Sequence, residues 1–334
     1  MHYHGAFWTT ALSVLEVEMR TLPVPLQLLQ VSVNAALRIK GTPTFRRMQQ
    51  YRSTGYAMCK DRLSPLQRIE LQANQILGPT DQIEEKAASV APPWWTPPQI
   101  SIADTASEAT KYHDRIHQQS KNDPKHLLMY SDGSDIKGRV GASSWCPKLN
   151  RQMGADLGPT SKATVYAAEL LGILYSTITA VTAREVKTVT LFVDNQAAIQ
   201  SVHSPGGQSG QLILRQIIHF VSVLQKRGIS IEICWIPAHT GVPGNEKADI
   251  IAKQATGWRA KGRTGQRAPQ SKWVQQLLSS CKRTVKEAIL HKWNVTWAKQ
   301  ATGRQYRSHF GSEIMSRKKG LSYIKDLLNR KLQF

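Results

Sequence analysis

The sequence contains little cysteine, no long apolar run and comparatively few acidic residues. Its four cysteines lie far apart and form no CxxC pair: Cys59, Cys146, Cys234 and Cys281. That spacing argues against a disulfide scaffold or a zinc knuckle and favours a reducing, intracellular compartment. No unbroken apolar run reaches ~18 residues, so a membrane-spanning helix is not expected. The opening of the chain also lacks the cationic-then-apolar layout of a secretory signal, because Glu16 and Glu18 interrupt it.

Positive charge is unevenly distributed along the chain. Lysine and arginine total 44 against 23 acidic residues, a net charge of +21. Residues 1–124 and 125–258 carry net charges of only +2 and +4, whereas residues 259–334 hold 18 basic and 3 acidic side chains, a net charge of +15. A basic segment of this kind is expected to neutralise the phosphates of a nucleic acid. The alternative is a solvated basic tail without a partner.

The regions on either side of the centre are expected to be mostly helical. Within residues 1–90, apolar residues recur near a 3.6-residue period in three segments: 9–19, 26–39 and 65–77. The stretch APPWWTPPQ contains four prolines, which remove backbone donors and fix φ, so residues 91–124 are predicted to form a Pro-rich linker. Residues 259–334 are predicted to form a basic helical extension.

Residues 125–258 have the pattern of a mixed α/β domain. Five short apolar runs bounded by turn residues predict strands: 127–133, 140–146, 151–157, 189–195 and 229–236. Four segments have helical periodicity: 163–184, 196–202, 212–225 and 242–254. Three antiparallel strands followed by helices that alternate with two more strands predict a five-stranded mixed sheet flanked by helices. The first strand is expected to stop at Asp132 and Gly133, a pair typical of a turn.

Four carboxylates occupy positions expected of an active site at the edge of a sheet. Asp132 and Asp194 each end a predicted strand, and the ends of neighbouring strands meet at one rim of a sheet. Glu169 and Asp249 lie among apolar residues of predicted helices. Buried acids are costly unless a cation pairs with them, and no matching lysine or arginine is evident nearby in the sequence.

This set of acids predicts a site for divalent metal. Oxygen ligands without cysteine or histidine indicate Mg²⁺ or Mn²⁺ rather than zinc. A pair of such ions can clamp the attacking and leaving oxygens of a phosphodiester. Taken singly, each acid can equally be a turn cap, a helix-start acid or half of a surface ion pair.

A glycine-rich loop precedes the last of these acids. In PAHTGVPGNEKAD, residues 237–249, glycines and prolines shape a loop that carries His239, and Asn245 is expected to cap the following helix. A histidine on such a loop suits proton delivery to a leaving group or release of product. The alternative is a solvent-facing histidine with no catalytic role.

Four motifs in this order resemble the type 1 ribonuclease H family: YSDGS at 130–134, YAAEL at 166–170, FVDNQ at 192–196 and HTGVPGNEKAD at 239–249. The resemblance covers about residues 125–258. It implies a ribonuclease H-like fold that hydrolyses the RNA strand of RNA–DNA hybrids with two divalent ions. It also implies that Asp132 bridges both metals, that Glu169 and Asp194 complete the site, and that Asp249 holds the second ion.

The same resemblance implies positions that contact the substrate. His239 matches the family's mobile loop histidine. Ser134 and Gln196 match positions that touch the nucleic-acid backbone or base edges. Asn245 matches a position near the scissile region, and Thr164 matches a phosphate contact.

The sequence departs from the family pattern at two places. Bacterial members often carry asparagines just before the helix glutamate, where this chain has Val165 and Tyr166, so reading of the RNA minor groove is expected to be weaker or achieved differently. The basic helical protrusion of some members is replaced by the short loop SPGGQSG, residues 204–210. The basic C-terminal segment is expected to take over its role.

Segments outside the domain resemble fungal non-LTR retrotransposon polyproteins. Residues 5–28 and 35–43 look like the region between polymerase and ribonuclease H, and residues 292–307 look like the region that follows ribonuclease H. The resemblance implies a fragment of a retroelement reverse-transcriptase protein, for which a nuclear location would be suitable. No YxDD-like metal motif occurs in residues 1–124, so the polymerase itself is not expected.

Two other functions fit parts of this pattern. A decayed retroelement copy would keep the fold and the basic arm as a nucleic-acid-binding module without turnover, although all four acids are present. A DNA transposase or integrase has a similar layout of sheet and acids, but the HxGxxGNExAD signature favours ribonuclease H.

Overall fold

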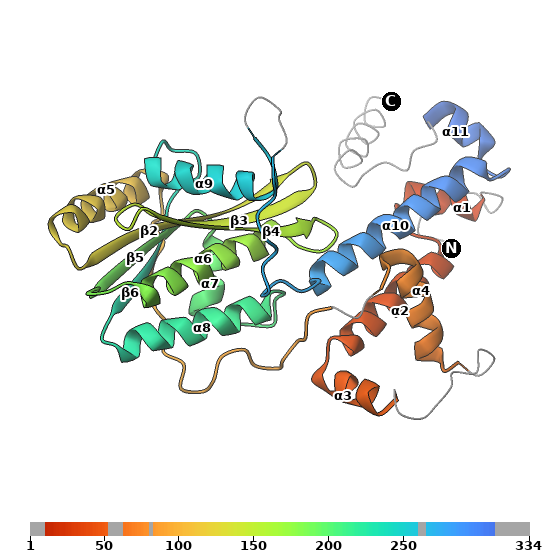
Figure 1. The fold of residues 1–334 in the computed structure, drawn as a ribbon. Coiled ribbons are helices and arrows are strands. Elements are labelled where there is room, and N and C mark those ends of the chain that lie inside the picture. Colours follow the sequence, from red (N-terminus) through yellow and green to blue (C-terminus); the bar gives the residue numbers. More distant parts are fainter. Residues whose placement is uncertain (1–10, 53–62, 80–82, 260–264, 311–334) are drawn as a thin grey trace. The chain divides into compact units, whose positions relative to one another are not determined.

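The computed structural model describes residues 11–52, 63–79, 83–259 and 265–310 (Figure 1). The chain divides into two compact units. The helical unit contains residues 1–37, 58–78 and 282–334, and the α/β unit contains residues 38–57 and 79–281. The α/β unit therefore extends beyond residues 125–258 on both sides.

A six-stranded sheet forms the centre of the α/β unit, in the order β1-β6-β5-β2-β3-β4 (Figure 1). Its strands are β1 (Gln99–Ser101), β2 (His126–Ile136), β3 (Arg139–Cys146), β4 (Arg151–Pro159), β5 (Thr188–Val193) and β6 (Ser230–Trp235). Neighbours from β1 to β2 in this order are parallel, whereas β2, β3 and β4 form antiparallel pairs. The mixed α/β class is confirmed, but the sheet has six strands instead of the five predicted.

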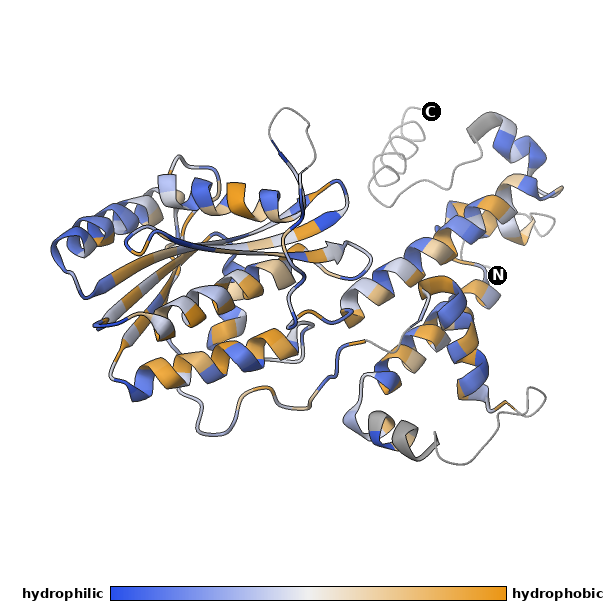
Figure 2. Ribbon diagram, viewed as in Figure 1, coloured by the Kyte–Doolittle hydropathy of each residue, from blue (hydrophilic) through white to orange (hydrophobic). Residues whose placement is uncertain are grey.

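Helices cover both faces of this sheet (Figure 1). The helices of the α/β domain are α5 (Ala106–Asn122), α6 (Val165–Thr182), α7 (Gln196–His203), α8 (Gln211–Lys226) and α9 (Pro243–Ala255). Helices α6, α7 and α8 pack on one face around a large core that includes Leu170 and Leu191. Helices α5 and α9 pack on the other face, over a smaller core that includes Tyr130 and Phe192. Figure 2 shows hydrophobic residues concentrated along the central strands between these two layers.

Helix α6 lies unusually close to strands β2 and β3. A Cβ atom added at Gly172 would lie 2.6 Å from the backbone oxygen of Ser143, and one added at Gly133 would lie 2.8 Å from the backbone nitrogen of Glu169. Both glycines therefore permit close packing. Among the described residues, α6 is the one helix long and apolar enough to cross a bilayer, but 72% of that stretch is buried inside the structure, as expected of a core helix.

Strand β2 continues beyond the point where the sequence predicts its end. It extends to Ile136, and Asp132 and Gly133 pair with Ser143 and Ala142 of β3. The prediction of a turn at Asp132 and Gly133 is wrong, because the glycine serves the close approach of α6 instead of a reversal of the chain.

Residues 91–124 contain more structure than a linker. After the prolines, β1 pairs in parallel with β6 and forms one edge of the sheet. Thr105 then caps the N-terminus of helix α5: its side-chain oxygen accepts a hydrogen bond from the backbone N–H of Glu108 at 3.2 Å. Its buried residues include Ile116 and His113, so this helix is part of the domain core.

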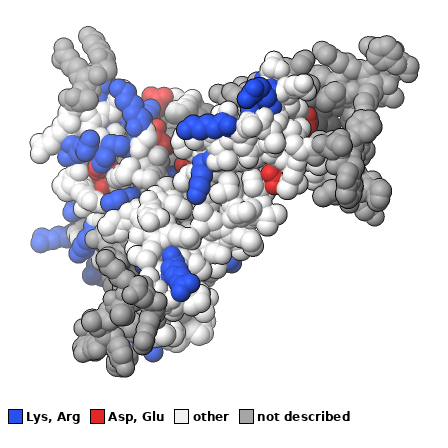
Figure 3. All heavy atoms as spheres, turned by 90° about the vertical axis from the view of Figure 1, so that its right-hand side faces the viewer, with Lys and Arg blue, Asp and Glu red and all other residues white. Residues whose placement is uncertain are grey.

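The remaining helices are α1 (Leu12–Glu18), α2 (Val24–Lys40), α3 (Pro43–Arg52), α4 (Pro65–Leu77), α10 (Leu278–Lys299) and α11 (Arg304–Phe310). In α4, Ser64 and Gln67 form a reciprocal capping box, which explains why the helix begins there. Within the helical unit, Val17 packs with the buried side chains of Trp293 and Trp297. On the face drawn in Figure 3, Lys and Arg side chains are far more prominent than Asp and Glu. Residues 311–334 of the basic extension lie outside the described residues.

Candidate active site

The sheet register brings two of the predicted acids together. Strands β2 and β5 are parallel neighbours, and Ser131 is paired with Val193. Asp132 and Asp194 directly follow these partners, so the two carboxylates lie side by side where β5 ends and β2 continues. The backbone carbonyl of Asp194 also accepts a hydrogen bond from the indole N–H of Trp235 at 3.1 Å, which fixes the end of β5.

Helix α6 adds the third carboxylate. Glu169 lies one turn into the helix and is 2% exposed, next to the strand position held by Gly133. Ligand oxygens of Asp132, Glu169 and Asp194 all lie within 4.8 Å of one another. The structure therefore gathers three of the four acids singled out in the sequence.

The donor set of this cluster fits a divalent cation. Oδ2 of Asp132 and Oε2 of Glu169 are buried and have no hydrogen-bond partner. Buried carboxylate oxygens without partners are costly, and a cation would satisfy them. Because the set is made only of carboxylate oxygens, it suits a hard ion of the Mg²⁺ type.

The three carboxylates repel one another when all are ionised. Burial, followed by the charges of Asp194 and Asp249, raises the pKa of Asp132 to about 8, although Lys253 acts in the opposite direction. Burial, and then Asp194 and Asp132, also raises the pKa of Glu169 well above its ordinary value. Burial raises the pKa of Asp194 too, against hydrogen bonds from Asn245 and Asp132 that lower it. Such a cluster favours a bound proton or a cation.

Asp249 stands apart from this group of three. It lies on α9, and its Oδ2 accepts a 2.6 Å salt bridge from Nζ of Lys253, one helical turn later. The expectation that no basic residue matches the acids is therefore wrong for Asp249. Its charge nevertheless acts on Asp132, so it borders the cluster. The i,i+4 spacing of Asp249 and Lys253 was the sequence signal for this pair.

Asn245 has a different place from the one expected. Helix α9 begins after Val242, so Asn245 lies inside the helix and does not cap it. Its side chain is 5% exposed, and it lowers the pKa of Asp194. Asn245 is therefore a buried amide next to a carboxylate of the cluster.

The loop histidine lies near the same carboxylate. His239 is exposed, in the loop between β6 and α9, and has a left-handed backbone with a φ of 55°. Its charge lowers the pKa of Asp194. The loop therefore holds an exposed imidazole within electrostatic reach of the acids.

The other predicted contact residues take three different positions. Ser134 is buried on β2, two residues beyond Asp132 and on the same face of the strand. Thr164 caps α6, and its hydroxyl accepts the backbone N–H of Ala167 at 3.2 Å. Gln196 is exposed at the first residue of α7. Substrate contact by these three residues stays a prediction.

The raised pKa values predict that the metal-free protein loses stability as pH rises. Asp132 has a folded-state pKa of about 8, above its unfolded value of about 4, so the folded chain binds more protons than the unfolded chain between these limits. The free energy of unfolding therefore falls as pH increases through that window. We expect a loss of about 1–3 kcal/mol between pH 5 and pH 8, measured by urea unfolding in EDTA.

The source of this pH dependence can be isolated with two matched variants. Asp132→Asn removes one of the titrating groups of the cluster and should reduce the slope. Asp135→Asn changes an exposed acid of the same strand and should keep the full slope. Equal slopes in the two variants would show that the cluster is not the source.

Comparison with known proteins concerns the same part of the chain. Residues 124–257 match a family model described as RNase H. A curated relative, "Ribonuclease H" of Polaromonas naphthalenivorans (strain CJ2), is 26% identical over 169 residues, which covers 45% of this chain and 98% of the relative. The fold, the acidic cluster and these two matches concern the same part of the chain, and residues 124–257 are therefore an RNase H domain.

Proposed function

We propose that this domain hydrolyses the RNA strand of RNA–DNA hybrids by a mechanism that uses two divalent ions, Mg²⁺ or Mn²⁺. The observation that carries the proposal is the cluster of Asp132, Glu169 and Asp194, with two buried carboxylate oxygens that lack partners. The domain match and the curated relative support ribonuclease H activity. The choice of metal and the number of ions rest on the chemistry of the carboxylates.

The acids have distinct roles in this proposal. Asp132 would contribute to both metal positions, and Glu169 and Asp194 would complete them. Asp249 would join the second position once its salt bridge with Lys253 opens. When bound, the ions would supply an activated water and neutralise the charge that develops on the leaving oxygen.

The residues around the acids would orient groups and move protons. Asn245, which lowers the pKa of Asp194, would orient that carboxylate. His239, on the exposed loop, would deliver a proton to the leaving 3′ oxygen or assist release of product.

Substrate binding would combine specific contacts with general attraction for phosphate. Ser134, Thr164 and Gln196 would touch the hybrid, with Thr164 at the phosphate. Helix α10 and the residues after it contribute part of the basic C-terminal extension, which would add phosphate contacts that weaken with salt. Because Val165 and Tyr166 replace the asparagines of bacterial members, recognition of 2′-hydroxyls would depend on other groups.

The proposal also includes an origin from a retroelement reverse-transcriptase protein. It rests on the likeness of residues 5–28, 35–43 and 292–307 to segments on either side of ribonuclease H in such polyproteins. A nuclear location would follow from that origin.

The proposed function is tested by incubating the full chain with a labelled RNA–DNA hybrid. We expect cleavage of the RNA strand with Mg²⁺ or Mn²⁺, no cleavage in EDTA, and no cleavage of duplex DNA. Binding without turnover under both metals would overturn the enzymatic proposal and leave a nucleic-acid-binding module. Strand transfer on duplex DNA would indicate a transposase or integrase instead.

A further inference from the structure

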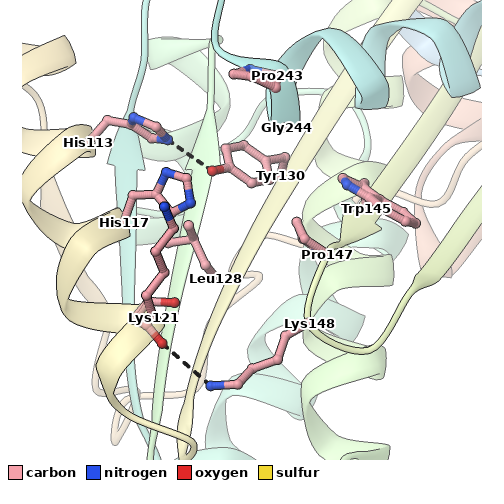
Figure 4. Close-up of a pocket in the computed structure, with 11 residues that line it drawn as sticks. His113, His117, Lys121, Leu128, Tyr130, Trp145, Pro147, Lys148, Pro243 and Gly244 are labelled. Atoms are coloured by element: carbon pink, nitrogen blue, oxygen red, sulfur yellow. Dashed lines mark hydrogen bonds between the residues drawn. The ribbon is translucent and has the colours of Figure 1, made fainter.

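A cavity lies on the same face of the sheet as Asp132. Its volume is about 490 Å³, within the range of small-molecule sites, and it lies between α5, the sheet and the start of α9 (Figure 4). Leu128 and Tyr130 of β2 form its floor. Tyr130 and Asp132 are two residues apart on one strand, so their side chains project from the same face. The cavity is therefore a neighbour of the acidic cluster and not part of it.

The floor of the cavity is held rigidly. The hydroxyl group of Tyr130 is hydrogen-bonded to Nε2 of His113 at 2.9 Å, and its ring stacks on Phe192 with centroids 5.8 Å apart. A Cβ atom at Gly244 would lie 2.2 Å from the Tyr130 ring, so the start of α9 packs directly on it. A fixed aromatic floor of this kind would not have to order itself on binding, which lowers the cost of association.

The opposite wall offers a second aromatic surface. Trp145, near the end of β3, is half-buried and lines the cavity across from α5 (Figure 4). Nζ of Lys247 lies 5.8 Å from the centre of its ring. An indole beside a cation is a surface on which a nucleobase can stack.

The walls of the cavity carry positive charge. Lys121 and Lys148 line it from opposite sides, and no residue lining it is acidic. Nζ of Lys148 donates to the backbone carbonyls of Asp123 at 2.6 Å and His126 at 3.1 Å, which fixes this ammonium group at the end of α5. An anionic group close to an aromatic or apolar body would complement these walls.

A nucleotide has both of these features. Its base can stack on Trp145, and its phosphate can pair with Lys121, with the charge of Lys148 adding to the attraction. A base that is paired and stacked in a duplex has no free face to lay on Trp145, so the occupant must come from a single strand. We propose that this cavity binds a nucleotide of a single-stranded extension that leaves the hybrid next to the active site. This inference rests on the proposed function for the position of the hybrid.

The test compares hybrids with and without an extension, using the full chain in EDTA so that no cleavage occurs. Fluorescence anisotropy is measured for a blunt hybrid and for the same hybrid with a short single-stranded extension at each end in turn. We expect one extension to lower Kd by about tenfold, the effect of one stacked base with its phosphate contact. Lys121→Glu and Trp145→Ala should remove this gain without changing Kd for the blunt hybrid.

A matched control separates the cavity from general charge. Lys111→Glu reverses an exposed charge on the same helix outside the cavity and should leave the gain intact. The proposal is overturned if Lys111→Glu and Lys121→Glu lose the same part of the affinity gain, or if no extension lowers Kd. Cleavage of the blunt hybrid would still uphold the proposed function in either case.

A further readout does not depend on binding of the hybrid. A single-stranded oligonucleotide that contains 5-iodouracil should crosslink to Trp145 on irradiation, as identified by mass spectrometry. Crosslinking confined to other residues would also overturn the proposal. If hybrid cleavage fails but these crosslinks form, the proposed function fails and the nucleotide site stands.

Discussion

Asp132→Asn is expected to reduce cleavage of an RNA–DNA hybrid by about a thousandfold or more, while Kd for the hybrid changes by no more than about twofold. Asparagine keeps the shape of the side chain but loses its negative charge and replaces one ligand oxygen with an amide nitrogen. Asp132 has a ligand oxygen within 4.8 Å of those of the other two acids of the cluster, and its Oδ2 is unpartnered. Binding should persist because basic residues elsewhere supply the phosphate contacts.

Two further measurements make this expectation specific to the acidic cluster. Asp135→Asn, at an exposed position of the same strand, should keep full activity. Addition of Mg²⁺ should raise the melting temperature of the original chain and of Asp135→Asn, but not that of Asp132→Asn. Substantial cleavage by Asp132→Asn would contradict the role given to the cluster.

The convergence of the acids could be predicted because it follows from sheet topology. Asp132 and Asp194 each follow an apolar strand segment, and two such segments become parallel neighbours in a mixed sheet. Glu169 was recognisable as an acid among apolar residues of a helix that has to pack on that sheet. The positions of these three acids could therefore be predicted from local sequence patterns and from the rule that the ends of neighbouring strands meet at one edge of a sheet.

Other features of the site depend on tertiary packing and could not be derived from local patterns. Asp132 and Gly133 have the sequence of a turn, but the close approach of α6 requires glycine at that position. Asn245 looks like a helix cap next to Pro243, yet the helix starts earlier and directs this side chain to Asp194. In both cases a contact with a distant part of the chain decides the role of the residue.

The limits of the domain were also hidden in the sequence. Strand β1 has only three residues, and the prolines before it suggest a linker. The buried carboxylate of Glu84 accepts the backbone N–H of Gly210 at 2.7 Å and that of Leu278 at 2.8 Å. One side chain thus joins three segments that are far apart in the chain. Pairings at such separations leave no periodic signal in any one segment.

These contacts predict that residues 125–258 alone fold poorly, whereas Pro79–Cys281 forms a stable and active unit. The shorter fragment lacks α5, so Leu128 and Phe192 lose the cover of Ile116, and it lacks both Glu84 and Leu278. We expect its free energy of unfolding to be lower by about 3–5 kcal/mol, a large part of the ~5–15 kcal/mol typical of a folded domain. Urea unfolding followed by circular dichroism measures the difference.

A point substitution in the longer fragment then identifies the cause. Glu84→Gln leaves the fragment complete but places an amide against two N–H donors, and should lower the free energy of unfolding by about 1–3 kcal/mol. Glu108→Gln, at an exposed position of α5, should leave it unchanged. If residues 125–258 prove as stable as Pro79–Cys281, the segments on either side do not contribute to the free energy of unfolding of the domain. If Pro79–Cys281 cleaves the hybrid and residues 125–258 do not, the acidic cluster needs segments outside the four sequence motifs for its activity.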